Sequence, residues 1–360
     1  MIHQPNWETV RKRYMDFWNH TLSGRAILNM RAPAPVDEPP MLSEPLPVND
    51  LHDRWENAEL ILHNALYDYG RTRYYAEGYP TRVVNFGPGN LAAMVGGTYK
   101  LAQDTIWFDN GPVIDDYARD LDKIRLNPDS DAYRVVFDMT RRFAGESRGR
   151  YITAITSLGT ATDIAVSLRG NENLLYDIYD EPEGLLALTE RLDDLWIEVY
   201  GRLYDLLQQY QTGCDSWHNI YCEKRYFPVQ CDFAAMLSPE QFDRFVMPSL
   251  RRCCDALDYG DFHLDGPDCI RHVPSLLSIP NLDAIQWVAG AGAAPDSDPC
   301  WYGMYRQIQD AGKNLILLGL DADGACRLLG ELDQTKLLLN VGCADEREAE
   351  RVLRFAEDHA

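Results

Sequence analysis

Short apolar runs alternate with longer amphipathic runs along most of the chain, a pattern typical of repeated strand–helix units. Amphipathic helices are expected at 182–210, 239–257, 302–311 and 344–358, and Ser238-Pro239-Glu240 is a strong start signal for the second of them. Strands are expected at 81–86, 151–157, 212–218, 229–233, 259–264, 282–287, 314–319 and 336–341. Eight strands are the number that a closed barrel needs.

The first part of the chain follows a different pattern. Residues 1–24 predict an amphipathic helix, 26–30 a short strand, and 51–69 another helix. The intervening run 32–50 is so rich in proline that only an ordered loop or arm is expected there. We therefore expect one (β/α)8 TIM barrel over 81–360, with residues 1–80 as an N-terminal helical and proline-rich extension packed on it. The alternative is a doubly wound open sheet, but no strand is followed by a glycine-rich nucleotide fingerprint.

Charge and cysteine content narrow the function classes. The 34 basic and 56 acidic residues give a formal net charge of −22, which disfavours nucleic acid, anionic membranes and highly anionic substrates. Nine irregularly spaced cysteines indicate reduced thiols rather than a disulfide framework. With neither a signal-peptide core nor a long apolar stretch, the sequence predicts a cytoplasmic protein that does not span a membrane. A homodimer remains open.

His263 and Asp265 are the first candidates for chemistry. They lie two residues apart near the end of an apolar strand, followed by Gly266-Pro267, so both side chains would point into the barrel mouth if the strand continues through Asp265. Active sites of such barrels lie at strand carboxyl ends. The alternative is structural, with Asp265 capping a helix and His263 hydrogen-bonded in the core.

A second group surrounds the segment 215–223, in which polar residues alternate with aromatic ones. Trp217 and Tyr221 would offer flat apolar faces to a small polar ring, and Asp232 and Glu223 could form a carboxylate pair for general acid and base work. Core packing for Trp217 and a solvated loop for Glu223 are the alternatives.

Further candidates lie at other strand ends and loops. Gln286-Trp287 and Trp301 would form an aromatic platform and a lid, with Trp107 closing the opposite side. Cys343 follows the last expected strand and precedes the last helix, where it is either a metal ligand, a thiolate activated by the helix N-terminus, or a buried inert cysteine.

Several stretches resemble the uroporphyrinogen decarboxylase superfamily, which includes corrinoid-linked methyltransferases. The resemblance covers most of residues 80–355 and rests on FGPGNLAAMVGG, TDIAVSLRGNENLLYDIYDEPEG, QCDFAAMLSPEQFDRFVMPSL, FHLDGPDCIRHVPSLLSIPNLDAIQWVAGAG and NVGCADEREAERVLRF. It implies the (β/α)8 barrel. Arg25 and Arg31 are present in the N-terminal region, but the rest of the decarboxylases' arginine signature is missing, so uroporphyrinogen is not the expected substrate.

The methyltransferase branch implies a zinc site. His263 falls on the histidine of its His-x-Cys pair and Cys343 on its distant cysteine, but Asp265 stands where the second ligand is cysteine. A carboxylate in place of a thiolate makes bound zinc a stronger Lewis acid, suited to an oxygen ligand rather than to a thiol.

Three functions are therefore expected as alternatives. The first is a zinc-dependent, methyltransferase-like enzyme for a small polar substrate, with His263, Asp265 and Cys343 as ligands and a corrinoid protein as partner. The second is a carbohydrate-acting enzyme that uses Asp232, Glu223 or Asp265 with Trp217, Trp287 and Trp301 as sugar platforms. The third is a metal-free decarboxylase or a ligand-binding barrel.

Overall fold

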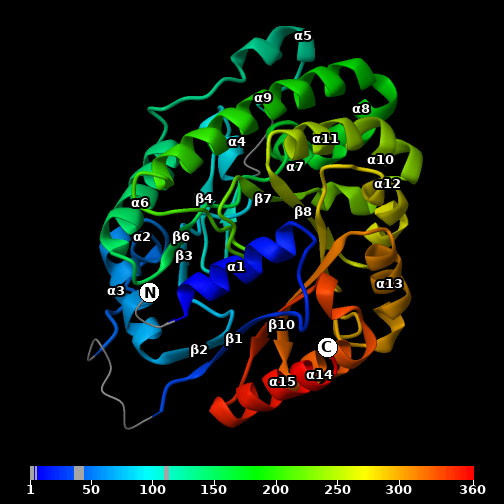
Figure 1. Ribbon diagram of the computed structural model, residues 1–360. Coiled ribbons are helices and arrows are strands. Elements are labelled where there is room, and N and C mark those ends of the chain that lie inside the picture. The colour runs from blue at the N-terminus through cyan, green and yellow to red at the C-terminus, as the bar shows by residue number, and fades with distance from the viewer. Residues whose placement is uncertain (1–3, 5, 36–43, 109–112) are drawn as a thin grey trace.

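A seven-stranded sheet forms the centre of the molecule (Figure 1). We describe the molecule from a computed structural model for all residues except 1–3, 5, 36–43 and 109–112. The strand order is β2-β1-β11-β10-β9-β8-β7, and all neighbours run parallel except β2, which is antiparallel to β1. The strands are β1 (Ile27–Pro33), β2 (Thr72–Ala76), β7 (Tyr226–Gln230), β8 (Tyr259–Asp265), β9 (Ala284–Val288), β10 (Asn314–Asp321) and β11 (Leu337–Gly342). The chain is thus a mixed α/β protein.

Two smaller sheets complete the strands of the described residues. β3 (Thr81–Val83) pairs in parallel with β6 (Ile152–Ala154), and β4 (Lys100–Leu101) pairs antiparallel with β5 (Ile106–Trp107). The expected strand at 26–30 is confirmed as β1, which lies between β2 and β11.

The expected strand at 212–218 is wrong. This segment forms only an isolated antiparallel bridge between Cys214 and Cys222. The buried carboxylate of Asp215 accepts hydrogen bonds from the backbone N–H groups of Ser216 and Ile220, which bends the chain back on itself. Asn219, directly after this segment, takes a positive φ of 58°, which departs from extended backbone. Hydrogen bonds from the backbone to the Asp215 side chain therefore take the place of strand-to-strand hydrogen bonds in this segment.

Helices surround the sheet, with α9–α15 arranged around its outside in Figure 1. The expected helix at 51–69 divides at Glu56-Asn57, and the one at 239–257 divides before Pro248, which cannot donate to the preceding turn. The start signal at Ser238 is confirmed as a capping box with Gln241. The α-helices are α1 (Trp7–Trp18), α2 (Leu51–Trp55), α3 (Ala58–Gly70), α4 (Asn90–Met94), α5 (Tyr117–Asp120), α6 (Asp131–Ser147), α7 (Ala161–Arg169), α8 (Asn171–Asp180), α9 (Pro182–Leu207), α10 (Pro239–Phe245), α11 (Met247–Asp255), α12 (Val273–Leu277), α13 (Tyr302–Asp310), α14 (Ala322–Glu331) and α15 (Glu346–Asp358).

Short 3-10 helices join several of these elements. They are η1 (Leu121–Lys123), η2 (Asp232–Met236), η3 (Pro267–His272), η4 (Pro299–Trp301) and η5 (Gln334–Lys336). Within the described part of the chain, none of the helices has the length and apolar character needed to cross a membrane. In the proline-rich run, residues 36–43 lie outside the described residues, and 32–33 belong to β1.

Helix α1 covers the amino ends of β7 and β8. Its Trp18 ring lies 4.6 Å from Tyr226 and 5.8 Å from Tyr259, the first residues of these two strands, and the Trp18 indole N–H donates to the carbonyl of Tyr221. The buried Glu77 carboxylate binds the guanidinium groups of Arg13 and Arg25. Helix α1 therefore covers the amino ends of β7 and β8, the opposite ends from Gln230 and Asp265.

Candidate functional site

A row of polar side chains crosses three neighbouring strands near their carboxyl ends. His263 of β8 lies beside Gln230 of β7 on one side and Gln286 of β9 on the other. Residues in register on parallel strands point to the same face, and i and i+2 share that face, so Asp265 and Asp261 lie on it too. Because β8 extends through Asp265, the expected shared face of His263 and Asp265 is confirmed.

Gln286 fixes the His263 ring. Its Oε1 contacts Nδ1 of His263, while its Nε2 donates to the carbonyl of Trp287 at 2.7 Å, which determines which amide atom faces the ring. The Gln286 side chain is buried. An oxygen can only accept, so Nδ1 carries the proton and Nε2 keeps its lone pair.

Asp232 joins His263 and Asp265 in one cluster. Asp232 is the first residue of η2, directly after the end of β7, and one ligand atom from each of the three side chains lies within 4.8 Å of the others. Of the described residues, these three form a group that could hold a metal ion. His263 is half-buried, whereas both carboxylates are exposed at the mouth of the site.

The electrostatics of the cluster favour a neutral imidazole. Burial lowers the pKa of His263, and the neighbouring His218 ring adds to this effect, against the opposing influence of Gln286 and the two carboxylates. Desolvation by the surrounding protein raises the pKa of Asp232. The neighbouring His263 lowers this pKa, and the negative charge of Asp265 raises it. A neutral imidazole and a pair of carboxylates are the forms that bind a divalent cation.

A third carboxyl group lies next to Asp232. Asp163 of α7 accepts a hydrogen bond from the backbone N–H of Phe233, but its Oδ2 atom is buried without a hydrogen-bond partner. Burial and the negative charge of Asp232 raise the pKa of Asp163 to about 7. The two carboxyl groups therefore repel each other when both are ionised, and a positive charge placed between them would stabilise both ionised forms.

A buried ionisable pair lies behind the cluster. His218 and Asp261 are both fully buried, with 2.8 Å between Nδ1 and Oδ2, although the contact lacks ordinary hydrogen-bond geometry. The His218 ring lies 5.7 Å from His263, and Trp217 lies 5.0 Å from His263. Since these rings are packed, they restrict the positions that His263 can adopt.

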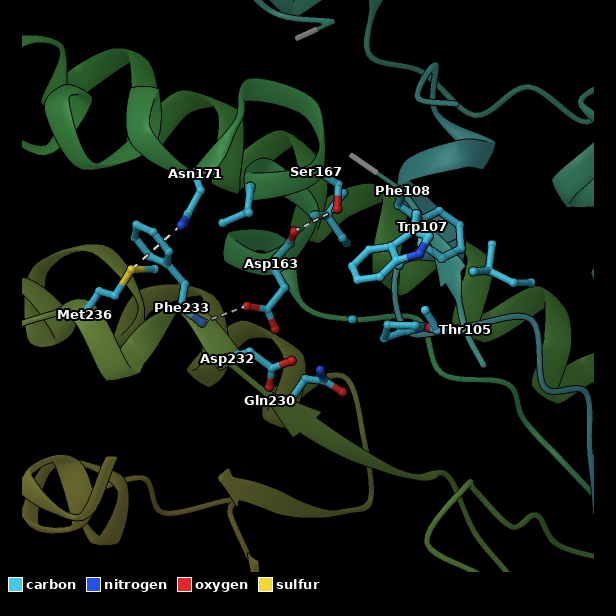
Figure 2. Close-up of a pocket in the computed structure, with 16 residues that line it drawn as sticks. Thr105, Trp107, Phe108, Asp163, Ser167, Asn171, Gln230, Asp232, Phe233 and Met236 are labelled. Atoms are coloured by element: carbon cyan, nitrogen blue, oxygen red, sulfur yellow. Dashed lines mark hydrogen bonds between the residues drawn. The ribbon is translucent and has the colours of Figure 1, made fainter. Parts of the chain in front are cut away.

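Two cavities open beside the cluster. The aromatic cavity, of about 430 Å³, is lined by Trp107, Phe108, Asp163, Phe233 and Met236 among others (Figure 2). The histidine cavity, of about 440 Å³, is lined among others by Trp55, Asp104, Trp217 and His263. Pro88, Thr105, Gln230 and Asp232 line both, so the cavities adjoin at Asp232. Trp107 and Trp217, two of the expected substrate-binding residues, thus line cavities beside the cluster.

Cys343 does not lie in this cluster. It follows β11, three strands away from β8 in the sheet, and its backbone N–H donates to the carbonyl of Arg31. Burial raises the pKa of its thiol to about 11, and the charges that act on it come from Glu348, Arg351, Cys326 and Asp345, in or beside helices α14 and α15. The structure therefore does not bring Cys343 to His263 and Asp265 as a ligand.

Glu223 does not pair with Asp232. It precedes β7 and binds Arg11 of α1 with 2.7 Å between the charged atoms, whereas Asp232 follows the other end of the strand. The strand alone separates the two by about 13 Å. Because paired glycosidase carboxyl groups are about 5–9.5 Å apart, Glu223 cannot act with Asp232 in this way.

Three expected aromatic platforms also lie away from the cavities. Trp287 is fully buried and in register with Leu264, on the opposite strand face from Gln286, where it packs 5.1 Å from Trp301. Tyr221 is buried 4.9 Å from Trp7, at the α1 end of the strands. None of the three lines either cavity. Gln286, expected to bind substrate, holds His263 instead.

Sequence reasoning missed Asp163 and the pair formed by His218 and Asp261. Asp261 could have been found from the strand pattern, because it alternates with His263 and Asp265 on a strand whose other positions are apolar. Asp163 carries no such signal, since acidic residues are common in the first turn of a helix.

Comparison with protein families and with curated proteins finds no match to this chain. The function must therefore be argued from the site itself.

Proposed function

We propose that the chain is an enzyme of the uroporphyrinogen decarboxylase type, built on an eight-stranded barrel. The eight strands would be β1, β3, β6 and β7–β11. Adjacency of the first and last of them, β1 and β11, supports this order, since a doubly wound sheet places its first strand in the middle. Thr160, which follows β6, donates to the carbonyl of Gln230 in β7, which links the smaller β3–β6 sheet to the large one.

The site would hold a divalent metal ion between Asp232, His263 and Asp265. The observation that carries this proposal is their proximity within 4.8 Å, with the Nε2 lone pair of His263 left free by the contact of Nδ1 with Gln286. Metal-binding histidines generally donate their other N–H to a fixed acceptor in this manner. Two carboxylates and one imidazole suit zinc, manganese or cobalt better than a soft, thiolate-seeking ion.

The activity we propose is methyltransferase-like and acts on a small polar substrate. The metal, when bound, would serve as a Lewis acid toward an oxygen atom of the substrate. Gln286 keeps the imidazole in one tautomer, Trp217 packs against it and excludes water, and Asp232 connects the metal ligands to the aromatic cavity. Of the described residues that line the two cavities, none is lysine or arginine, which disfavours an anionic substrate.

A corrinoid protein would be the partner in methyl transfer. It would dock over the strand carboxyl ends, where large apolar side chains are exposed beside the aromatic cavity. Trp107 is 59% exposed and Met236 is 45% exposed, and both would offer apolar surface to such a partner.

Metal analysis of protein purified without chelators tests the proposal. We expect about one zinc, manganese or cobalt ion per chain, its loss in His263→Ala and Asp232→Asn, and its retention in Asp268→Asn, a nearby exposed carboxylate paired with Arg271. A wild-type protein without any of these metals, which also fails to bind them on titration, would refute the metal site.

A further inference from the structure

Aromatic and acidic side chains together line the cavity next to the proposed metal site. Trp107 and Phe108 come from β5 and the residue after it, and Phe233 comes from η2. Aromatic ring faces attract cations through their quadrupole, and recognition of alkylated ammonium groups is the best-known use of such rings. Neutral sugars also bind aromatic rings, so the charge of the cavity must decide between these ligands.

The ionisable side chains that line the aromatic cavity are both acidic. Asp163 and Asp232 both line it, and Figure 2 shows their carboxyl groups pointing into the same region, with Trp107 on the facing wall. The Oδ2 atom of Asp163 is buried and has no hydrogen-bond partner. Lysine and arginine are absent from the described lining residues. A buried carboxylate oxygen without a partner is costly unless a ligand supplies the missing interaction.

We propose that the aromatic cavity binds a small organic cation that carries an alkylated ammonium group. The alkyl groups would contact Trp107, Phe108 and Phe233, and the positive charge would lie near Asp163 and Asp232. The cavity volume of about 430 Å³ falls within the range of small-molecule sites, roughly 300–1,000 Å³.

The substrate class of the enzyme follows from the connection between the cavities. Since Asp232 lines the aromatic cavity and also belongs to the cluster with His263 and Asp265, a molecule held by its ammonium end would present its other end to the metal ligands. An oxygen group on a short chain from the ammonium group would suit that position. This assignment of the substrate rests on the proposed function, whereas binding of the cation does not need the metal.

Calorimetric titration with choline and with 3,3-dimethylbutan-1-ol, its neutral isostere, tests the cation site. We expect choline to bind at least about tenfold more tightly than the isostere. Asp163→Asn and Trp107→Leu should each weaken choline binding about fivefold or more, with little effect on the isostere for Asp163→Asn. The control is Tyr176→Leu, which removes an exposed aromatic ring on α8 that does not line the cavity.

The outcomes separate this inference from the proposed function. Equal affinity for the two ligands, no binding of either, or a loss of choline binding in Tyr176→Leu as large as in Trp107→Leu would overturn the cation site. Each titration is run with chelator-treated and with metal-loaded protein. A preference for choline in a protein that binds no metal would support the cation site while refuting the metal-dependent function, and metal binding without that preference would do the reverse.

Discussion

Replacing Gln286 by leucine should weaken metal binding while leaving the protein folded. The side chain of Gln286 is buried, and its two hydrogen bonds join His263 to the carbonyl of Trp287. Leucine has a similar volume but cannot accept from Nδ1, so the imidazole loses its fixed tautomer and orientation. Such outer partners of metal-binding histidines are worth about 10–100-fold in affinity, or about 1.4–2.7 kcal/mol.

The same change also costs some folding stability. The carbonyl of Trp287 loses the N–H of Gln286, and a buried group left unsatisfied costs about 1–3 kcal/mol. This cost is smaller than the typical stability of a folded domain, so the variant should remain folded. The matched control is Gln309→Leu, which removes a buried amide that donates to the carbonyl of Asp333 at a distance from the site.

Competition with a chromophoric chelator measures zinc and manganese affinity for the three proteins, and urea denaturation measures their stability. We expect Gln286→Leu and Gln309→Leu to lose similar stability, but only Gln286→Leu to lose metal affinity. Equal metal affinity in wild type and Gln286→Leu would refute the role of Gln286. An equal loss of affinity in both variants would show that the effect arises from general destabilisation.

Three further predictions concern stability. Asp163→Asn should raise the Tm of the metal-free protein at about pH 8 by about 2 °C, because it removes a carboxyl group whose pKa is raised by burial and by Asp232; a lower Tm would contradict this. Glu77→Gln should cost about 3 kcal/mol in urea denaturation, since it breaks a buried pairing with Arg13 and Arg25, whereas Glu223→Gln, at a more exposed pair, should cost less than about 1 kcal/mol; similar costs would refute the distinction. Burial raises the pKa of Asp193 from 3.8 to about 6; nearby Asp194 and Glu190 also raise it, and Arg252 lowers it. As the pH falls, the folded state therefore binds this proton at a higher pH than the unfolded state does. Wild-type stability relative to Asp193→Asn should then fall as the pH rises from 4 to 6, by up to about 3 kcal/mol, and a pH-independent difference would refute it.

The part of the site that could be predicted from sequence is the part set by strand periodicity. His263 and Asp265 alternate with Phe262 and Leu264, so a strand through Asp265 necessarily turns the polar pair to one face. Continuous apolar runs, buried on both faces, locate β9, β10 and β11 closely, but they place β7 three residues too late, at 229–233 instead of Tyr226–Gln230. The start of α10 was predictable as well, since Ser238 and Pro239 act through local geometry alone.

Residues beyond the strand ends escape this reasoning. Cys343 lies after the last residue of β11, so strand alternation no longer fixes the direction of its side chain. Its backbone N–H donates to the carbonyl of Arg31 in β1, which lies more than 300 positions earlier in the sequence. Glu223 and Asp232 are close in sequence, but the five-residue strand β7 between them places them at opposite ends of that strand. Segment 212–218 has a strand-like pattern that the hydrogen bonds of Asp215 override.

The observed cluster contains Asp232 where the sequence predicted Cys343, and this difference moves the centre of the site. A ligand set that included Cys343 would span from β8 toward β11, whereas Asp232 places all three groups over β7 and β8. Both cavities lie on this side, and their described lining residues come from 55, 83–89, 104–108, 156–171, 217, 230–236 and 263, with none from β9, β10, β11 or β1. The first half of the chain therefore supplies most of the lining of the two cavities, while η2 and β8 supply the proposed metal ligands. A change of substrate preference should accordingly come from substitutions in the first half, at Trp107 or Asp163, without loss of metal binding.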